Sequence, residues 1–194
     1  MRPFTIVLTC FLITQSAFSQ KKRSTKIGTV SDKELQMTRY DKDTIANAVI
    51  LLEHANYYID EKRDYKKRTD FYYKVKILNK DGFSKATIEI PFFDKEKVIN
   101  IKGITSNLSD KSIQQNHLID SKVYEKNITE KWKEITFTLP NVKIGSVIEY
   151  SYSVISPYSK IDDWNFQSDI PKKESNFTAA ILGNWKYNIR LTGF

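Results

Sequence analysis

Apolar and polar residues alternate in two neighbouring segments of the chain, Phe71–Ile77 and Ser84–Ile90. This period of two is the pattern of a β-strand with one buried face, because successive side chains of a strand point to opposite sides. Between the two segments stands Asn79-Lys80-Asp81-Gly82, which predicts a turn with Gly82 at a positive φ angle. Two alternating runs around an Asp-Gly turn predict a β-hairpin.

Most of the remaining chain is also predicted to be extended, from alternation or from its β-branched and aromatic residues. The further strands are predicted at Ala48–Ile59, from Val98 onward, at Lys122–Tyr124, Trp132–Leu139, Val147–Ser156 and Trp185–Leu191. The charged stretch Glu61–Arg68 is predicted to connect two strands, and Asn107–Lys111 to form a turn.

One short helix is predicted near the N-terminus, where Ser31 and Glu34 have the spacing of a capping box. Many strands at this spacing with a single helix predict an all-β fold. We expect mainly an antiparallel β-sandwich or a strongly curved sheet.

The first nineteen residues have the three-part pattern of a secretory signal peptide. A positive start at Met1-Arg2-Pro3 is followed by the apolar run Phe4–Ile13, and Ala17-Phe18-Ser19 predicts cleavage between Ser19 and Gln20. The apolar run is too short to span a bilayer, and no transmembrane segment is predicted in the mature form. We therefore expect an exported protein, located in the periplasm, the cell envelope or the medium, with a signal peptide at 1–19, a flexible leader at 20–30 and a β-domain at 31–194.

Charge and composition narrow the function classes. The formal net charge of +8 and the Lys- and Arg-containing stretch Glu61–Arg68 raise the possibility of nucleic-acid binding. That stretch also contains acidic residues, and export removes the protein from nucleic acid, so no nucleic-acid partner is predicted. Long-range attraction to an anionic cell envelope suits the charge better.

Groups for catalysis or metal binding are sparse in the sequence. The single cysteine, Cys10, lies in the predicted signal peptide, and the two histidines, His54 and His117, stand far apart. Gly145-Ser146 lacks the pattern of a nucleophile elbow, and there is no phosphate-binding glycine loop. Asp162-Asp163 is predicted to form a turn before Trp164 rather than an acid–base pair, which needs two carboxyl groups across a cleft. We predict no catalytic residue, no metal site and no cofactor.

Aromatic residues are plentiful, and they suggest sugar stacking as an alternative to core packing. The candidates for such a stripe are Tyr57, Tyr58, Tyr72, Tyr73, Tyr150, Tyr152, Trp164 and Phe166. Because strand side chains alternate, about half of these rings must face the core. We predict that Tyr158, Trp164 and Phe166, close to the Asp162-Asp163 turn, form a binding surface.

Three motifs resemble the bacterial domain of unknown function 3857. They are Tyr73–Gly82 with Ala86–Pro91 after it, Phe137–Tyr150, and Ser156-Pro157 followed by Asp163–Pro171. With the helix and the first strand, the resemblance covers about residues 31–170. This module commonly stands between a signal peptide and a transglutaminase-like core.

The resemblance implies an all-β module similar to the saddle-shaped N-terminal domain of zinc aminopeptidases. The family has no established catalytic residues, so it implies none here. Thiol chemistry would belong to a transglutaminase-like core with a Cys-His-Asp arrangement, and the chain stops at Phe194 before any such core. Beyond Pro171 the sequence departs from the family pattern, and we expect the domain to be incomplete at its C-terminus.

Two functions remain open on the sequence. The first is a non-catalytic module that binds or positions a transglutaminase-like core, an envelope polymer, or a peptide added to a sheet edge. The alternative is an exported hydrolase that acts on envelope polymers through Asp162, Asp163 and Asp169.

Overall fold

The computed structural model describes residues 25–61, 64–110, 112–158, 161–183, 186–190 and 192. The predicted signal peptide and its cleavage site between Ser19 and Gln20 lie outside these residues. Within the described ranges, no helix has the length and apolar content needed to cross a bilayer.

The described residues form one short α-helix, nine strands and two 3₁₀ segments. The helix is α1 (Asp32–Gln36), and the strands are β1 (Ala48–Asp60), β2 (Lys66–Ile77), β3 (Thr87–Phe93), β4 (Lys97–Ser109), β5 (Ser112–His117), β6 (Val123–Asn127), β7 (Trp132–Thr138), β8 (Val147–Ser156) and β9 (Ser175–Ala179), with 3₁₀ segments η2 (Lys80–Ala86) and η3 (Asp120–Lys122). The predicted helix is confirmed together with its capping box. The amide of Glu34 donates to Ser31 Oγ over 3.3 Å, and the amide of Ser31 donates to Glu34 Oε2 over 2.8 Å.

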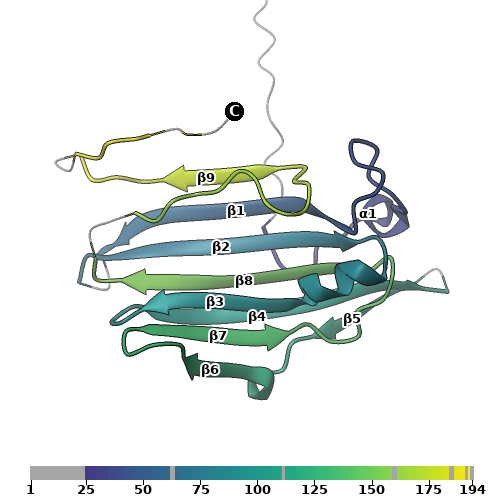
Figure 1. Ribbon diagram of the computed structural model, residues 1–194, viewed down its shortest axis with the longest axis horizontal. Helices are drawn as coiled ribbons and strands as arrows, with labels where there is room; N and C mark the ends of the chain where they lie inside the picture. Colours follow the sequence, from purple (N-terminus) through teal and green to yellow (C-terminus); the bar gives the residue numbers. More distant parts are fainter. Residues whose placement is uncertain are drawn as a thin grey trace, which may run out of the picture.

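Two sheets make up the fold (Figure 1). A six-stranded sheet has the order β5-β4-β8-β2-β1-β9, and a three-stranded sheet has the order β3-β7-β6. Every pairing is antiparallel except that of β9, which runs parallel to β1. The predicted all-β sandwich is thereby confirmed.

The main core lies between the two sheets. The larger sheet contributes Ala48, Ile50, Val75, Ile77 and Ile148, and the smaller sheet contributes Ile88, Ile90, Phe92, Ile135 and Phe137. In β3 the burial alternates residue by residue, so the predicted apolar face of this strand is confirmed. Burial of these side chains from both sheets is the main apolar contribution to stability.

The predicted hairpin is wrong. β2 pairs with β1 and β8, whereas β3 pairs with β7 in the other sheet. The segment predicted as a turn begins the 3₁₀ segment η2, where Asn79 Oδ1 accepts hydrogen bonds from the amides of Asp81 (3.0 Å) and Gly82 (3.3 Å). Alternation identifies the buried face of each strand but not its partner, and η2 carries the chain from one layer of the sandwich to the other.

Gly82 also differs from its prediction. Its φ angle is not positive. Among the described glycines, only Gly28 and Gly145 have a positive φ angle. A Cβ on Gly82 would lie 2.4 Å from the carbonyl oxygen of Asn47. Glycine is needed here for close backbone approach rather than for a left-handed turn.

One predicted strand boundary and one predicted strand are also corrected. The charged connection ends earlier than expected, because β2 begins at Lys66, which pairs with Asp60. The strand predicted at Trp185–Leu191 is not found, since residues 186–190 lie outside any strand. The edge of β1 is instead taken by β9, where Phe177 pairs with Ala55. An alternating run can form a strand only where a sheet edge is open to it.

Candidate functional site

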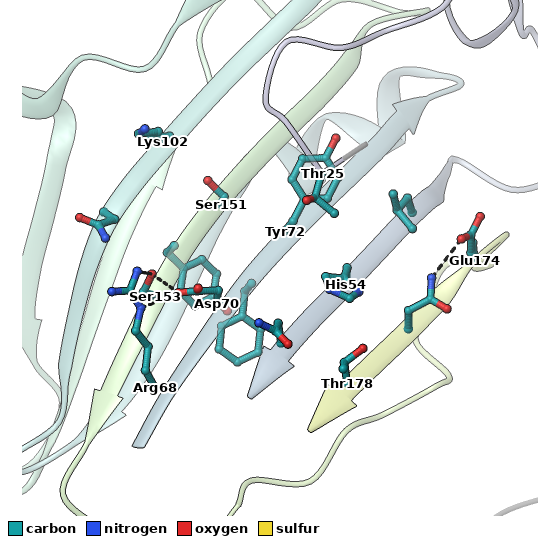
Figure 2. A pocket seen from close by; sticks show the side chains of 16 residues that line it. Thr25, His54, Arg68, Asp70, Tyr72, Lys102, Ser151, Ser153, Glu174 and Thr178 are labelled. Atoms are coloured by element: carbon teal, nitrogen blue, oxygen red, sulfur yellow. Dashed lines mark hydrogen bonds and ion pairs between the residues drawn. The ribbon is translucent and has the colours of Figure 1, made fainter. Parts of the chain in front are cut away.

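The outer face of the six-stranded sheet points away from the three-stranded sheet and has two different halves. One half is covered by the N-terminal segment, whose Leu35 and Tyr40 pack on Val49, Leu51 and Val147. The other half forms an open groove of about 1270 Å³ (Figure 2). This groove is the candidate site.

A row of five side chains crosses the groove at right angles to the strands. The strand register places one residue from each of five strands in this row. They are Lys102 of β4, Ser151 of β8, Tyr72 of β2, His54 of β1 and Asn176 of β9. Residues opposite each other in neighbouring strands share a face of the sheet, so the row belongs to one surface. With strands about 4.8 Å apart, it spans about 19 Å.

A second row lies beside the first. It runs over β8, β2, β1 and β9 and contains Ser153, Asp70, Asn56 and Thr178. Figure 2 shows the labelled members of both rows on the same side of the strands. The groove is therefore lined by hydroxyl, amide and charged groups from strands that lie far apart in the sequence.

The charged groups in the middle of the groove are bonded to one another. Arg68 Nε donates to Asp70 Oδ1 over 2.8 Å, and the hydroxyl of Ser153 donates to the same oxygen over 2.6 Å. The hydroxyl of Tyr58 donates to the other carboxylate oxygen over 3.1 Å. Burial alone would lower the pKa of Arg68, but the hydrogen bond and charge of Asp70 outweigh it and hold the pKa above its ordinary value.

Buried charges link the groove to the N-terminal segment. The hydroxyl of Tyr72 donates to Glu149 Oε1 over 2.5 Å, and the amide of Gly28 donates to Glu149 Oε2 over 3.1 Å. Lys74 Nζ donates to the carbonyl of Thr29 over 2.5 Å and lies 3.9 Å from Glu149 Oε1. Burial raises the pKa of both the Tyr72 hydroxyl and the Glu149 carboxyl.

Several neutral groups of the groove have their hydrogen-bonding capacity unused. Among the described residues, no side-chain hydrogen bond is made by Asn56, Ser151 or Thr178, which lie in the two rows. Amide and hydroxyl groups both donate and accept, so they suit a ligand with mixed polar groups. The exposed Lys102 adds a positive charge at the β4 end.

The geometry is better suited to binding than to nucleophilic catalysis. Ser151 and His54 occupy the same row, but β2 and its Tyr72 lie between them. Their backbones are therefore two strand spacings apart, about 10 Å, which is too far for the direct hydrogen bond that activates a serine. Across the described ranges, no group of three metal-ligating side chains converges.

The three residues predicted as a binding surface have different surroundings. Trp164 packs its ring 6.4 Å from Phe71 and 5.7 Å from Phe177, and its Nε1 donates to Ser175 Oγ over 3.0 Å. Tyr158 donates to Asp94 Oδ2 over 2.8 Å. Phe166 is 55% exposed. The structure gives Trp164 a packing role and leaves the ring of Phe166 accessible.

The aromatic rings proposed for sugar stacking divide between the two faces of the large sheet. Tyr73 and Tyr150 stack with ring centroids 4.7 Å apart, and Phe71 and Tyr152 stack at 4.8 Å, on the face turned towards the smaller sheet. Tyr72 lies on the outer face but is only 3% exposed. Core packing accounts for most of these rings.

The acidic candidates do not meet in the groove. Asp162 and Asp163 are exposed in the segment before Trp164, and Asp169 forms an ion pair with Lys85. The hydrogen bond from Lys85 lowers the pKa of Asp169. His54 is in the groove, while His117 lines a smaller adjoining hollow that shares Lys102 and Ser151 with it.

The sequence did not point to the groove, although it contains a partial signal. Arg68 and Asp70 were placed in or next to a charged connection, but with Tyr72 and Lys74 they continue an alternating polar face of β2. The neighbours of this face come from β1, β8 and β9, and their register is set only by folding.

Comparison with known proteins gives one family match. The family described as Domain of Unknown Function with solved-structure structure (DUF3857) matches residues 63–193. The match confirms the family that the sequence motifs indicated, but its bounds differ from the expected 31–170. It begins at residue 63 and continues to residue 193, past Pro171, where the sequence was expected to depart from the family pattern. No curated protein matches the chain.

Among solved structures, the chain is similar to a crystal structure of a candidate protease from Parabacteroides distasonis ATCC 8503. The TM-score is 0.45 and the sequence identity is 14%. The similarity covers 57% of this chain and 23% of the other chain.

Proposed function

The chain belongs to the DUF3857 family, and on this premise we propose that it is a non-catalytic β-module that binds a macromolecular partner through the groove on its outer sheet face. In this proposal the module is exported and acts as the accessory domain of a transglutaminase-like protein. The partner is the catalytic core of that protein or a polymer of the cell envelope.

The shape and lining of the groove carry the proposal. A small-molecule site is usually a mostly apolar cleft or cavity that buries most of its ligand, whereas this groove is open and carries polar side chains from five strands. Interfaces between domains of one chain are polar and of moderate size. A polar, open surface of this width therefore favours a large partner over a small substrate.

The electrostatics of the groove point the same way. Asp70 accepts three hydrogen bonds, from Arg68, Ser153 and Tyr58, so most of its acceptor sites are already used within the protein. The neutral groups at Asn56, Ser151 and Thr178 have capacity left for a partner. Such an arrangement suits recognition by hydrogen bonds.

A binding experiment tests the polymer form of the proposal. The purified chain is co-sedimented with peptidoglycan sacculi over a range of concentrations. We expect saturable binding that Asn56→Trp weakens at least tenfold, because a bulky ring at this position fills the groove. Thr138→Trp, on the exposed face of β7, is the matched control and should bind like the wild type.

Two further measurements address catalysis and the accessory role. The chain should show no turnover of peptidoglycan or casein, and turnover abolished by one substitution would contradict the proposal. Sequencing the gene beyond codon 194 should find an open reading frame that encodes a Cys-His-Asp core. A stop codon at that point would contradict the accessory role.

Export has its own test. The protein is fractionated from its host cells and its N-terminus is determined. We expect extracytoplasmic protein that begins at Gln20, and intact Met1 in cytoplasmic protein would contradict export.

A further inference from the structure

β5 is an edge strand whose backbone is open on one side. It is the first strand of the six-stranded sheet and pairs only with β4. Five of its six residues are exposed, and the sixth, Asn116, is half-buried. None of the six, Ser112-Ile113-Gln114-Gln115-Asn116-His117, is Lys, Arg, Asp, Glu or Pro. Such an edge is a template for another strand.

The other edges of the described sheets differ from β5. β3 contains Pro91, which cannot donate a ladder hydrogen bond, and β6 carries the charges of Glu125 and Lys126. At β9 the chain that follows the strand returns over the sheet, where Tyr187 Oη lies 3.3 Å from Tyr57 Oη. β5 therefore lacks the devices that protect β3 and β6 from pairing.

The register of β5 shows which of its backbone groups point outward. The amide of Leu118 donates to the carbonyl of Gly103 over 2.9 Å, next to the pair Ile104 and His117. Hydrogen-bonded and non-hydrogen-bonded pairs alternate along an antiparallel ladder. The outward N–H and C=O groups of β5 are consequently those of three alternate residues, Ile113, Gln115 and His117.

From this geometry we infer that β5 is a self-pairing surface, through which two copies of the chain join their large sheets about a twofold axis. The axis is perpendicular to the sheet and passes Gln115. It sets Gln115 against its own copy and Ile113 against His117 of the other copy, so that outward donors meet outward acceptors. Between them, Gln114 faces Asn116, and the two amides can exchange hydrogen bonds.

The residues of β5 permit self-pairing although the molecule as a whole is strongly charged. The chain has a net charge of +8, which opposes association between copies in general. The contact proposed here is built from six residues, none of which is Lys, Arg, Asp or Glu. Like charges are therefore not brought directly opposite each other in the new ladder.

The twofold axis also fixes the relation of the two grooves. Because it is perpendicular to the sheet, it keeps the outer faces of both copies on the same side. The dimer would present two grooves to one extended partner, which raises the effective affinity without any new contact. The pairing itself does not depend on what the groove binds.

Analytical ultracentrifugation of the purified chain tests the pairing. We expect a reversible monomer–dimer equilibrium, observable at concentrations up to about 500 μM because the contact is small. Gln115→Pro removes an outward donor and leaves the ladder to β4, and it should raise the dimer dissociation constant at least tenfold. Gln115→Ala is the matched control: it loses the side-chain bonds to Gly28 and Ser106 but keeps the N–H, and its dissociation constant should stay within twofold of the wild type.

A second pair of variants guards against a folding defect in Gln115→Pro. Ile113→Lys places a charge on the edge and should also weaken the dimer tenfold or more, while Ile113→Gln should not. A monomeric wild type over the whole concentration range overturns the inference, even if a synthetic β5 peptide binds the edge. A dimer that survives both disruptive variants overturns it too.

Amide hydrogen exchange gives a residue-level test within the unmodified chain. In dilute solution the outward amides of Ile113, Gln115 and His117 should exchange quickly, and the inward amides of Gln114 and Asn116 slowly. Raising the protein concentration should slow the outward amides at least tenfold and leave the inward ones nearly unchanged. Equal behaviour of the two sets would contradict the proposed register.

Discussion

The hydroxyl of Tyr72 donates a 2.5 Å hydrogen bond to Oε1 of Glu149, a carboxylate with no exposed surface. This contact joins the polar groove to the charges buried beneath the N-terminal segment. The second oxygen of Glu149 is held by the amide of Gly28. The position of residues 25–40 on the sheet and the shape of the groove floor therefore depend on the same buried carboxyl group.

The first prediction concerns Glu149→Gln. Burial holds the pKa of Glu149 above its ordinary value of 4.5, so the unfolded chain releases this proton at a lower pH than the folded chain does. As the pH rises from 4 to 7, the free energy of unfolding of the wild type should fall relative to that of E149Q. Urea titrations at each pH measure the difference, with the exposed Glu89→Gln as control. A difference that is constant with pH would contradict the prediction.

Lys76→Met should show the opposite pH dependence. Lys76 is fully buried and donates to the carbonyl of Leu35 over 2.7 Å, and burial lowers its pKa from 10.5 to about 8. Between these two values the unfolded chain binds the proton and the folded chain does not, so stability rises with pH. From pH 8 to 10.5 the wild type should gain up to about 3 kcal/mol relative to K76M.

The control for Lys76→Met is Lys80→Met, at an exposed position of η2. Its free energy of unfolding should follow that of the wild type over the same pH range. An equal change in both variants would assign the effect to general titration rather than to Lys76.

Gly82→Ala should destabilise the fold by about 2 kcal/mol, because the added Cβ would lie 2.4 Å from the backbone carbonyl oxygen of Asn47. Thermal and urea unfolding measure the loss. Gly183→Ala is the matched control, since a Cβ there meets no atom within 4 Å. Similar stability of the two variants would show that the contact between η2 and the start of β1 can relax.

Thr105→Val should stabilise the protein by about 1 kcal/mol. The hydroxyl of Thr105 is buried and has no hydrogen-bond partner among the described residues, so its desolvation is not compensated. Thr138→Val, at an exposed hydroxyl bonded to Thr87, should not increase stability. A loss of stability in T105V would indicate a partner, such as an ordered water, for this hydroxyl.

Local patterns predicted the elements of this fold better than their partners. The strand Val147–Ser156 and the capped helix after Ser31 were predicted correctly, because alternation and capping are encoded within a few residues. The hairpin between β2 and β3 was wrong for a reason that local sequence does not contain. Asn79 and Gly82 serve a 3₁₀ segment against Asn47, which lies more than thirty positions earlier in the chain.

The sequence by itself determined that the chain is an all-β domain of the DUF3857 family, and which face of most strands is buried, since these properties follow from residue types and their spacing. Only the tertiary structure decided the order of the strands, the groove and the open edge. His54, Tyr72, Ser151 and Asn176 become neighbours through the register of β1, β2, β8 and β9. That register is set by packing of the two sheets across the core and by the buried charges around Glu149, which bring together residues remote in sequence.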